Sequence, residues 1–213
     1  MFSRSVDVLV ADLADVQVDE DLLSVAELGR ALGIASPAAL RQYLAAHTWL
    51  RQRLSEYLEH PAAEIEFGED EHGKPAIVVP DTGLSFNLSY SGGLAVLAIG
   101  FRVAVGVDIE TLEGAKVNPE MVHRVLSRPE ADTVFASSDM LKEFYKLWVR
   151  KEAMAKAVGG DREMTATNVL GVSPVSRGGF DITDVNLGEG FMAAVTVPEG
   201  CSIELTMLMG ASV

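Results

Sequence analysis

Two long helical tracts, each flanked by short strand candidates, constrain the fold of this chain most strongly. The first spans residues 38–58, where leucines recur at helical spacing after the start signal Ser36-Pro37. The second spans residues 139–158 and stops at Gly159. Apolar strand candidates lie at residues 6–10, 64–67, 77–79, 84–110 (a meander), 168–172, 179–182, 190–197 and 202–208. The order of strand, helix and strands occurs twice, which predicts an α+β chain built from two related halves.

The second half carries two further helical segments, at residues 118–126 and 128–137. Ser127 followed three residues later by Glu130 is the sequence of a capping box, which predicts the start of the second of these helices. No low-complexity linker separates the halves. We therefore expect two tightly packed subdomains, residues 1–101 and 102–213, with an approximate boundary.

The charge of the chain argues against a nucleic-acid partner. It holds 31 acidic and 17 basic residues, a net charge of −14, whereas nucleic-acid binders show a basic surface. The basic residues are unevenly distributed, because five of the 17 fall within 15 residues: Lys142, Lys146, Arg150, Lys151 and Lys156. We expect any anionic ligand to bind near this local concentration of positive charge.

The hydropathy pattern predicts a protein without a membrane segment. No run approaches the roughly 20 consecutive apolar residues that a span requires. Acidic residues interrupt the N-terminal apolar stretch, which is typical of a strand and not of a signal peptide. The single cysteine, Cys201, excludes an internal disulfide. These features lead us to expect cytoplasmic residence.

The segment Gly106-Val107-Asp108-Ile109-Glu110 suggests a cation site. Because alternate residues of a strand share a face, Asp108 and Glu110 lie together while Val107 and Ile109 face the core. Mg²⁺ is commonly held by one or two carboxylates together with substrate phosphates. The alternative is a strand that simply becomes polar as it leaves the core.

The helix around residues 144–159 has an apolar face for packing and a second, mixed face. Trp148, Glu152 and Lys156 follow one another at intervals of four residues and share that second face. A surface ion pair between Glu152 and Lys156 is the plainer interpretation, and the aromatic residue in the same row favours a functional one. Similarly, Ser89-Tyr90-Ser91 before Gly92-Gly93 suits phosphate binding, although a strand ending in a turn has the same appearance.

Taken together, FNLSYS (86–91), GVDIE (106–110) and FYKLWVRKEAMAKAVG (144–159) resemble the Sfp-type 4'-phosphopantetheinyl transferases. That family shows N-[LI]-S-H-S, G-[VI]-D-[IVL]-E and W-x-x-K-E-A-x-x-K-x-x-G in this order. HGKP (72–75) and RVLSRPE (124–130) extend the resemblance. It implies a pseudo-twofold pair of α/β subdomains with the active site at their interface, in a monomer.

The resemblance implies transfer of the phosphopantetheine arm of coenzyme A to a serine of an apo acyl or peptidyl carrier protein, releasing 3',5'-ADP. The positions of Asp108, Glu110 and Glu152 match the acids that hold Mg²⁺, with Mn²⁺ as an alternative ion. Glu152 is also a candidate base for the serine, and Lys156 a candidate for contacting phosphate and assisting the leaving group. Glu130 matches a position considered for base or metal roles, but its capping box favours a structural role.

Coenzyme A contacts are implied for residues in both halves: Arg41, Arg51, Lys74, Pro75, Ser89, Tyr90 and Lys156. Tyr90 departs from the family pattern, which has His at this position. A tyrosine donates one hydrogen bond and carries no positive charge at neutral pH. The lead into the first long helix also lacks a basic residue before Arg41. Recognition of the 3'-phosphate therefore falls to Arg41 or Arg51.

The carrier protein is expected to be acidic, like this chain, so docking requires a local patch, for which residues 112–121 with Arg124 and Arg128 are candidates. Two other functions stay open. A relative that binds coenzyme A or a carrier without transfer would explain Tyr90 but leaves the retained acids unexplained. A Mg²⁺-dependent hydrolase of a nucleotide diphosphate would use the same acids, but the chain has no Walker loop.

Overall fold

The computed structural model describes residues 5–69, 73–159 and 168–208. The N-terminal half contains two helices, five strands and two 3-10 turns. They are β1 (Ser5–Asp12), a turn (Glu20–Leu22), α1 (Val25–Ala31), α2 (Pro37–Leu58), a turn (Ala62–Glu64), β2 (Glu66–Glu69), β3 (Pro75–Val79), β4 (Leu84–Ser91) and β5 (Leu94–Phe101).

The C-terminal half repeats this order with a strand, helices and then strands. Its elements are β6 (Gly106–Thr111), α3 (Pro119–Val125), α4 (Arg128–Ala136), α5 (Met140–Val158), β7 (Val175–Arg177), β8 (Phe180–Asp184), β9 (Phe191–Pro198) and β10 (Ser202–Leu208). None of the helices in the described part of the chain is long and apolar enough to cross a membrane.

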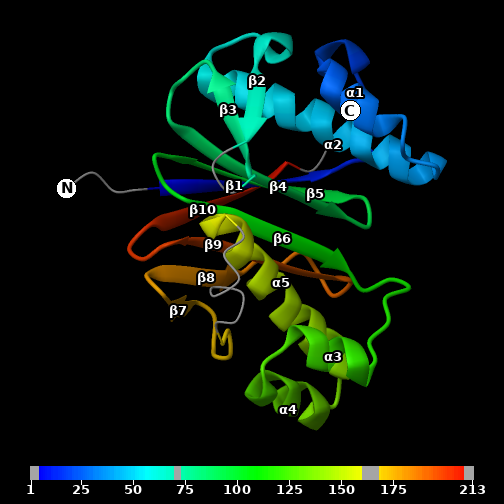
Figure 1. The fold of residues 1–213 in the computed structure, drawn as a ribbon, viewed down its shortest axis with the longest axis vertical. Coiled ribbons are helices and arrows are strands. Elements are labelled where there is room, and N and C mark those ends of the chain that lie inside the picture. Colours follow the sequence, from blue (N-terminus) through cyan, green and yellow to red (C-terminus); the bar gives the residue numbers. More distant parts are fainter. Residues whose placement is uncertain (1–4, 70–72, 160–167, 209–213) are drawn as a thin grey trace.

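Two four-stranded sheets form the centre of the molecule (Figure 1). The first has the order β10-β1-β5-β4 and the second the order β6-β9-β8-β7, while β2 and β3 form a separate hairpin. The pairs are antiparallel except for β1 with β10. The last strand of the C-terminal half therefore completes the sheet of the N-terminal half.

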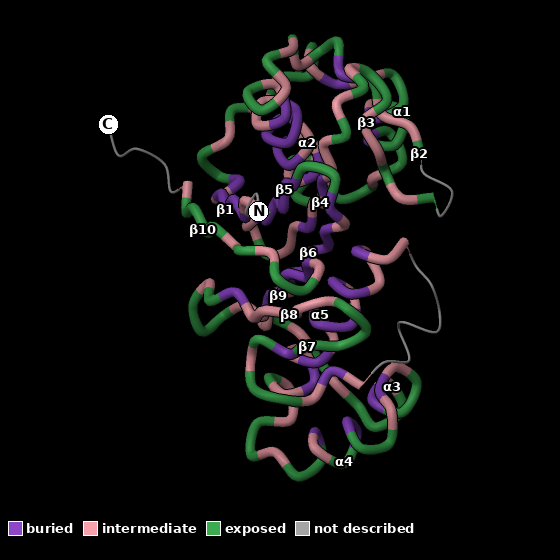
Figure 2. Tube along the Cα trace, turned by 90° about the vertical axis from the view of Figure 1, so that its left-hand side faces the viewer, coloured by how far each residue is buried: buried purple, intermediate pink, exposed green. Residues whose placement is uncertain are grey.

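The molecule has four layers, with the two sheets packed against each other and helices on the outside. Val8 of β1, Val96 of β5 and Val107 of β6 belong to one buried cluster between the sheets. A second cluster joins the first sheet to α2, and a third joins the second sheet to α3, α4 and α5. Figure 2 shows the buried segments running through the middle of the molecule, with the exposed segments at its surface.

The halves correspond in topology, as the sequence predicted, and also in one buried interaction that the sequence did not predict. In each half the first strand pairs with the last strand of an antiparallel set, and one long helix covers the outer face. Each long helix sends a buried basic side chain to a carboxylate on a shorter helix, Arg51 to Glu27 and Lys151 to Glu130. Both carboxylates also close a capping box, with Ser24 and Ser127 respectively.

The structure confirms most predicted elements and corrects two. The predicted meander over 84–110 is wrong in its last strand, because β6 leaves β5 and pairs with β9 in the second sheet. The strand predicted at 168–172 is also absent from the described residues, where 168–172 contain a bend and no ladder. The predictions missed α1 and β7. His72 of the quoted HGKP motif lies outside the described residues.

Candidate active site

The site forms along the seam where β4, at the edge of the first sheet, meets β6 of the second. The side chains at odd-numbered positions of β4 face β6. Their hydrogen bonds to β6 take the place of backbone hydrogen bonds between these two strands. Asn87 Oδ1 accepts from the Val107 N–H at 2.8 Å, and Ser91 Oγ accepts from the Thr111 N–H at 3.1 Å. Between them, Ser89 Oγ donates to Asp108 Oδ1 at 3.0 Å. This row of polar side chains fixes the position of the acidic strand.

Helix α5 approaches β6 closely because residue 106 has no side chain. A Cβ atom at Gly106 would lie 2.0 Å from the Ala153 carbonyl oxygen and 2.5 Å from the Ala157 nitrogen. Any larger residue would push the helix away from the strand. Gly106 thus allows the side chains of Glu152 and Lys156 to reach the seam.

Lys156 connects the two sides of the seam. Its Nζ lies 2.6 Å from Asp108 Oδ1 and 3.2 Å from both Ser89 Oγ and the Val107 carbonyl oxygen. The side chain of Asp108 is 7 % exposed, whereas that of Lys156 is 30 % exposed. The lysine is therefore anchored to a buried carboxylate and remains accessible to an anion from outside.

The three acids predicted from the sequence influence one another electrostatically. Burial raises the pKa of Asp108, against the opposing effects of Lys156 and Ser89. Burial and then the nearby Asp108 raise the pKa of Glu110, and the same two causes raise the pKa of Glu152. Ser91 Oγ donates to Glu110 Oε2 at 3.3 Å, and the Trp148 side chain also bonds this carboxylate. Burial is thus the main cause of the raised pKa values, and repulsion from Asp108 adds to it at Glu110 and Glu152.

The seam fits a divalent cation in its chemistry. Asp108 Oδ2 is buried and has no hydrogen-bond partner among the described residues, which is unusual for a carboxylate oxygen. A hard cation would pair with this oxygen and reduce the repulsion among the acids. Within the described ranges, no group of three or more acidic, histidine or cysteine side chains is placed so that it could hold a metal ion by itself. The remaining ligands would come from substrate and water, as is usual for Mg²⁺.

A cavity of about 220 Å³ opens beside the seam, between β3, β4 and the end of α5. Its lining includes Lys74, Pro75, Phe86, Ala157 and Val158. Lys74 Nζ donates to the Val105 carbonyl oxygen at 2.7 Å, across the boundary between the two halves. The structure thus places both predicted residues of the 73–75 turn next to the strand that leads into the acidic cluster.

The structure does not bring Arg41 and Arg51 into this cluster. Arg51 lies inside the N-terminal half with its side chain 1 % exposed, and it donates to Glu27 and to the carbonyl oxygens of Ala62 and Ile65. In this arrangement Arg51 could bind a phosphate only by breaking its hydrogen bonds to these partners, which would leave buried groups unpaired. Arg41 is exposed and donates to the Val16 carbonyl oxygen at 2.9 Å. The even-numbered Tyr90 faces α2, away from Ser89 and Asp108.

Glu130 has the structural role that its capping box predicted. Its Oε2 accepts from the backbone and the hydroxyl of Ser127, and it lies 3.1 Å from Lys151 Nζ. Its Oε1 accepts from the Val169 N–H. Burial alone would raise the pKa of Glu130, but these hydrogen bonds and the lysine lower it below the usual value.

Sequence reasoning missed the role of Asn87 and Ser91, whose side chains bond the backbone of β6 and support the site from β4. Asn87 and Ser91 lie two residues on either side of Ser89, so the strand period that placed Asp108 and Glu110 together also marks them. The cluster of Glu27 and His47 in the N-terminal half was missed as well. Its signal was Ser24-x-x-Glu27, the same capping-box spacing that was recognised at Ser127.

Comparison with known proteins agrees with this geometry. The model of the 4'-phosphopantetheinyl transferase superfamily matches residues 104–198, which contain the acids and Lys156. The chain is 32 % identical over 181 residues to the 4'-phosphopantetheinyl transferase AcpT of Escherichia coli O157:H7, covering 83 % of this chain and 86 % of that protein.

Two other relatives match over a smaller share. The 4'-phosphopantetheinyl transferase HetI of Nostoc sp. is 31 % identical over 141 residues, 64 % of this chain and 60 % of HetI. The mouse L-aminoadipate-semialdehyde dehydrogenase-phosphopantetheinyl transferase is 32 % identical over 128 residues, 54 % of this chain and 41 % of its own length. Because AcpT is matched over most of its length and the superfamily model covers the segment that contains Asp108, Glu110 and Glu152, the chain belongs to the 4'-phosphopantetheinyl transferase superfamily.

Proposed function

We propose that this chain transfers the 4'-phosphopantetheine arm of coenzyme A to a serine hydroxyl of an apo acyl or peptidyl carrier protein. The observation that carries the proposal is the seam cluster of Asp108, Glu110, Glu152, Lys156 and Ser89. It combines excess carboxylates, one of which has a buried unpaired oxygen, with an accessible lysine. These are the groups that a metal-assisted reaction on a diphosphate requires.

Asp108, Glu110 and Glu152 are the residues that would hold Mg²⁺, or Mn²⁺ in its place. Asp108 Oδ2 can act as a ligand while Lys156 keeps its contact with Oδ1. When bound, the ion supplies positive charge against the coenzyme A diphosphate and its departing 3',5'-ADP.

Lys156 and Ser89 are the proposed protein contacts for the diphosphate. Lys156 Nζ contacts Asp108 and Ser89, and the Lys156 side chain is 30 % exposed. A lysine fixed in this way stabilises developing charge on the leaving group without having to reorganise. Lys74 and Pro75, which line the adjacent cavity, are the proposed contacts of the adenosine part.

Glu152 is the proposed base for the serine hydroxyl. It lies on α5 one turn before Lys156 and is half-buried at the seam. In the reaction the serine oxygen bonds to the β-phosphorus and the bond from that phosphorus to the oxygen of 3',5'-ADP breaks. The serine proton passes to Glu152, directly or through water, and Lys156 stabilises or protonates the departing oxyanion.

The carrier protein is expected to dock on the C-terminal half beside the seam. Arg124 of α3 and Arg128 of α4 are both exposed and offer positive charge to an acidic partner. We further propose that the chain acts as a monomer in the cytoplasm, with the halves dividing near residue 101 and the site between them.

The test is to incubate the protein with coenzyme A, Mg²⁺ and a panel of apo-carriers and to measure the intact mass of each carrier. We expect one carrier class to gain a single phosphopantetheine, and the gain to vanish with EDTA and in Glu152→Gln. If no carrier gains mass while coenzyme A still binds by calorimetry, the transferase assignment fails in favour of a binding-only relative.

A further inference from the structure

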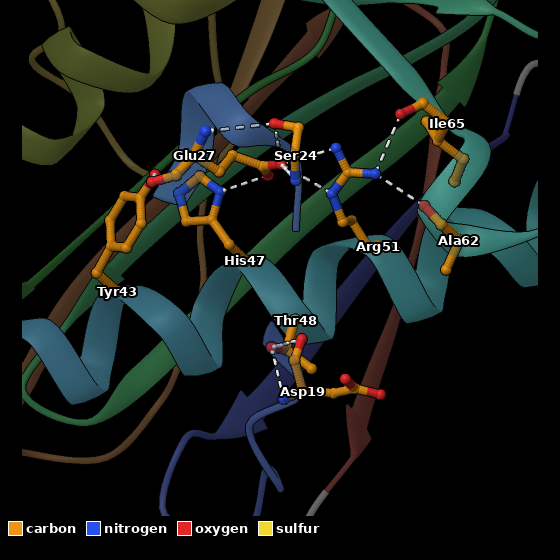
Figure 3. Close-up of polar contacts among 9 residues, drawn as sticks. All are labelled: Asp19, Ser24, Glu27, Tyr43, His47, Thr48, Arg51, Ala62 and Ile65. Carbon is orange, nitrogen blue, oxygen red and sulfur yellow. Dashed lines mark hydrogen bonds and ion pairs between the residues drawn. The ribbon is translucent and has the colours of Figure 1, made fainter. Parts of the chain in front are cut away.

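A half-buried imidazole lies beside the phosphate-binding strand, on the face opposite to Lys156. His47 of α2 directs Nδ1 to Glu27 Oε1 at 3.0 Å, and its ring stacks on Tyr43 at 4.1 Å between centroids. Figure 3 shows one ring nitrogen turned to Glu27 and the other turned away from it. The edge of the ring meets Tyr90 of β4 at 6.5 Å between centroids.

The hydrogen bonding of Glu27 decides which nitrogen of His47 carries the proton. Burial alone would raise the pKa of Glu27, but the bonds from His47, Arg51 and Ser24 hold it well below its usual range. An ionised carboxylate can only accept, so Nδ1 of His47 is the donor. Nε2 forms no hydrogen bond to a described residue and is not among their buried unpaired polar atoms, so it is open to an outside partner, to which it donates when the ring carries a second proton.

The charges around His47 favour an anion at that position. Arg51 donates to Glu27 through Nε and Nη2 and balances its charge, so a proton on His47 leaves a net positive charge on this group. The other titratable groups that face it are Tyr43 and Tyr90, with Arg30 close to Tyr43. Burial raises the pKa of Tyr90, so this phenol stays neutral at pH 7 and adds no negative charge.

We propose that His47, oriented by Glu27, is a second phosphate-binding side chain for coenzyme A. In the complex both ring nitrogens are protonated, and Nε2 donates to the phosphate the charged hydrogen bond that the neutral Tyr90 cannot provide. This inference rests on the proposed function. It places the bound ligand along β4, so that the ligand reaches from Ser89, on the face toward Lys156, to Tyr90, on the face toward α2. The ligand chemistry is a phosphate oxygen of the nucleotide, from either the 3'-phosphomonoester or the diphosphate.

Two substitutions separate the roles of the two ring nitrogens. The amide nitrogen of His47→Asn can replace Nδ1 and keep the bond to Glu27, but it removes Nε2. Conversely, His47→Gln places an amide nitrogen near the Nε2 position and weakens the bond to Glu27. The matched control is His60→Asn, because His60 is also a partly exposed imidazole near a glutamate, Glu64, just beyond the end of α2.

The experiment is calorimetric titration of each variant with coenzyme A and with dephospho-coenzyme A, in Mg²⁺ buffer, alongside thermal melting. We expect His47→Asn to melt like the wild type and to bind coenzyme A about tenfold more weakly. His47→Gln should retain part of the affinity, and His60→Asn all of it. An unchanged affinity of His47→Asn for dephospho-coenzyme A would identify the phosphomonoester as the contact, and a parallel loss would identify the diphosphate.

Wild-type affinity for coenzyme A in His47→Asn would overturn the inference and leave the proposed function intact. Equal losses in His47→Asn and His60→Asn would also overturn it, because the effect would then be general to α2. If the wild type itself does not bind coenzyme A, the proposed function fails and this inference fails with it.

Discussion

The buried pair of Glu27 and Arg51 and the seam cluster around Asp108 and Lys156 use the same kinds of groups in opposite ways. In the buried pair both side chains are less than 5 % exposed, and Arg51 also donates to two backbone carbonyl oxygens. In the seam cluster Lys156 is 30 % exposed, and a buried oxygen of Asp108 has no hydrogen-bond partner in the part of the chain that the structure describes. The buried pair has its hydrogen bonds formed within the protein, whereas the seam cluster leaves a carboxylate oxygen and a lysine to which a ligand could bind.

This difference indicates which charged groups maintain the fold and which serve the reaction. The buried pair has a counterpart, Glu130 with Lys151, in the C-terminal half, as expected for an interaction that belongs to the common architecture. The seam cluster has no counterpart among the described residues of the N-terminal half, and it lies where the halves meet. Substitutions in the buried pairs should therefore affect stability, and substitutions in the seam cluster should affect activity.

The largest effect is expected from breaking a buried pair. Glu27→Gln would leave the buried Arg51 without the carboxylate that pairs with it, and Glu130→Gln would remove the buried carboxylate that pairs with Lys151. Breaking a buried pair costs about 3–5 kcal/mol of unfolding free energy. Urea denaturation measures the loss. The control is Glu56→Gln, whose ion pair with Arg53 is largely exposed and should contribute about 0–1 kcal/mol. Equal losses in Glu27→Gln and Glu56→Gln would remove the distinction between the two kinds of pair.

The second effect is the converse, a loss of activity without a loss of stability. Asp108→Asn should lower the transfer rate about 100-fold or more, because the charge that pairs with the cation disappears. Its unfolding free energy should be unchanged or higher, since the repulsion with Glu110 and Glu152 is relieved. Rates and urea midpoints from the same preparations would check both statements. A variant as unstable as Glu27→Gln would contradict them.

The third effect is on the pH dependence of stability. The pKa values of Glu27 and Glu130 are lowered in the folded state, so their contribution is present above the unfolded value near 4.5 and is lost as the pH falls below it. Unfolding free energy should therefore fall between about pH 5 and pH 3. Either glutamine variant should reduce that slope by up to about 1.4 kcal/mol per pH unit. Parallel curves for wild type and Glu130→Gln would refute this account of the pair.

The smallest effect is expected for Ser91, which supports the position of Glu110 in the seam cluster. Ser91→Ala removes a bond to Glu110 and the acceptor of the Thr111 N–H, which should cost about 1 kcal/mol and slow transfer a few-fold. The exposed bond from Ser5 to Glu204 provides a control, and Ser5→Ala should change neither quantity measurably. Identical behaviour of the two alanine variants would mean that Ser91 does not position Glu110.

The sequence predicted the parts of the molecule that depend on periodicity. The strand period placed Asp108 and Glu110 on one face of β6, opposite Val107 and Ile109, and the structure shows this arrangement. The helical period and the capping signals predicted α2 and α5 to within about one residue at either end. Periodicity reports which residues share a face, and it does so without information from the rest of the chain.

Partners distant in the sequence could not be predicted in this way. The pattern of β6 does not state which sheet it joins, so the strand was assigned to the wrong neighbour. The position of Arg51 on α2 likewise did not show that Glu27, 24 residues earlier, would bind it inside the protein. A charged residue within an apolar helical stripe, close to a capping-box glutamate, is the pattern that would have indicated a buried pair.

The central claim, that the seam cluster holds a divalent cation together with coenzyme A, can be tested by titrating Mn²⁺ in the presence of coenzyme A and following free Mn²⁺ by electron paramagnetic resonance. The account predicts one bound ion per chain in the wild type and in folded Glu56→Gln, and none of comparable affinity in Asp108→Asn. Undiminished Mn²⁺ binding in Asp108→Asn would contradict it.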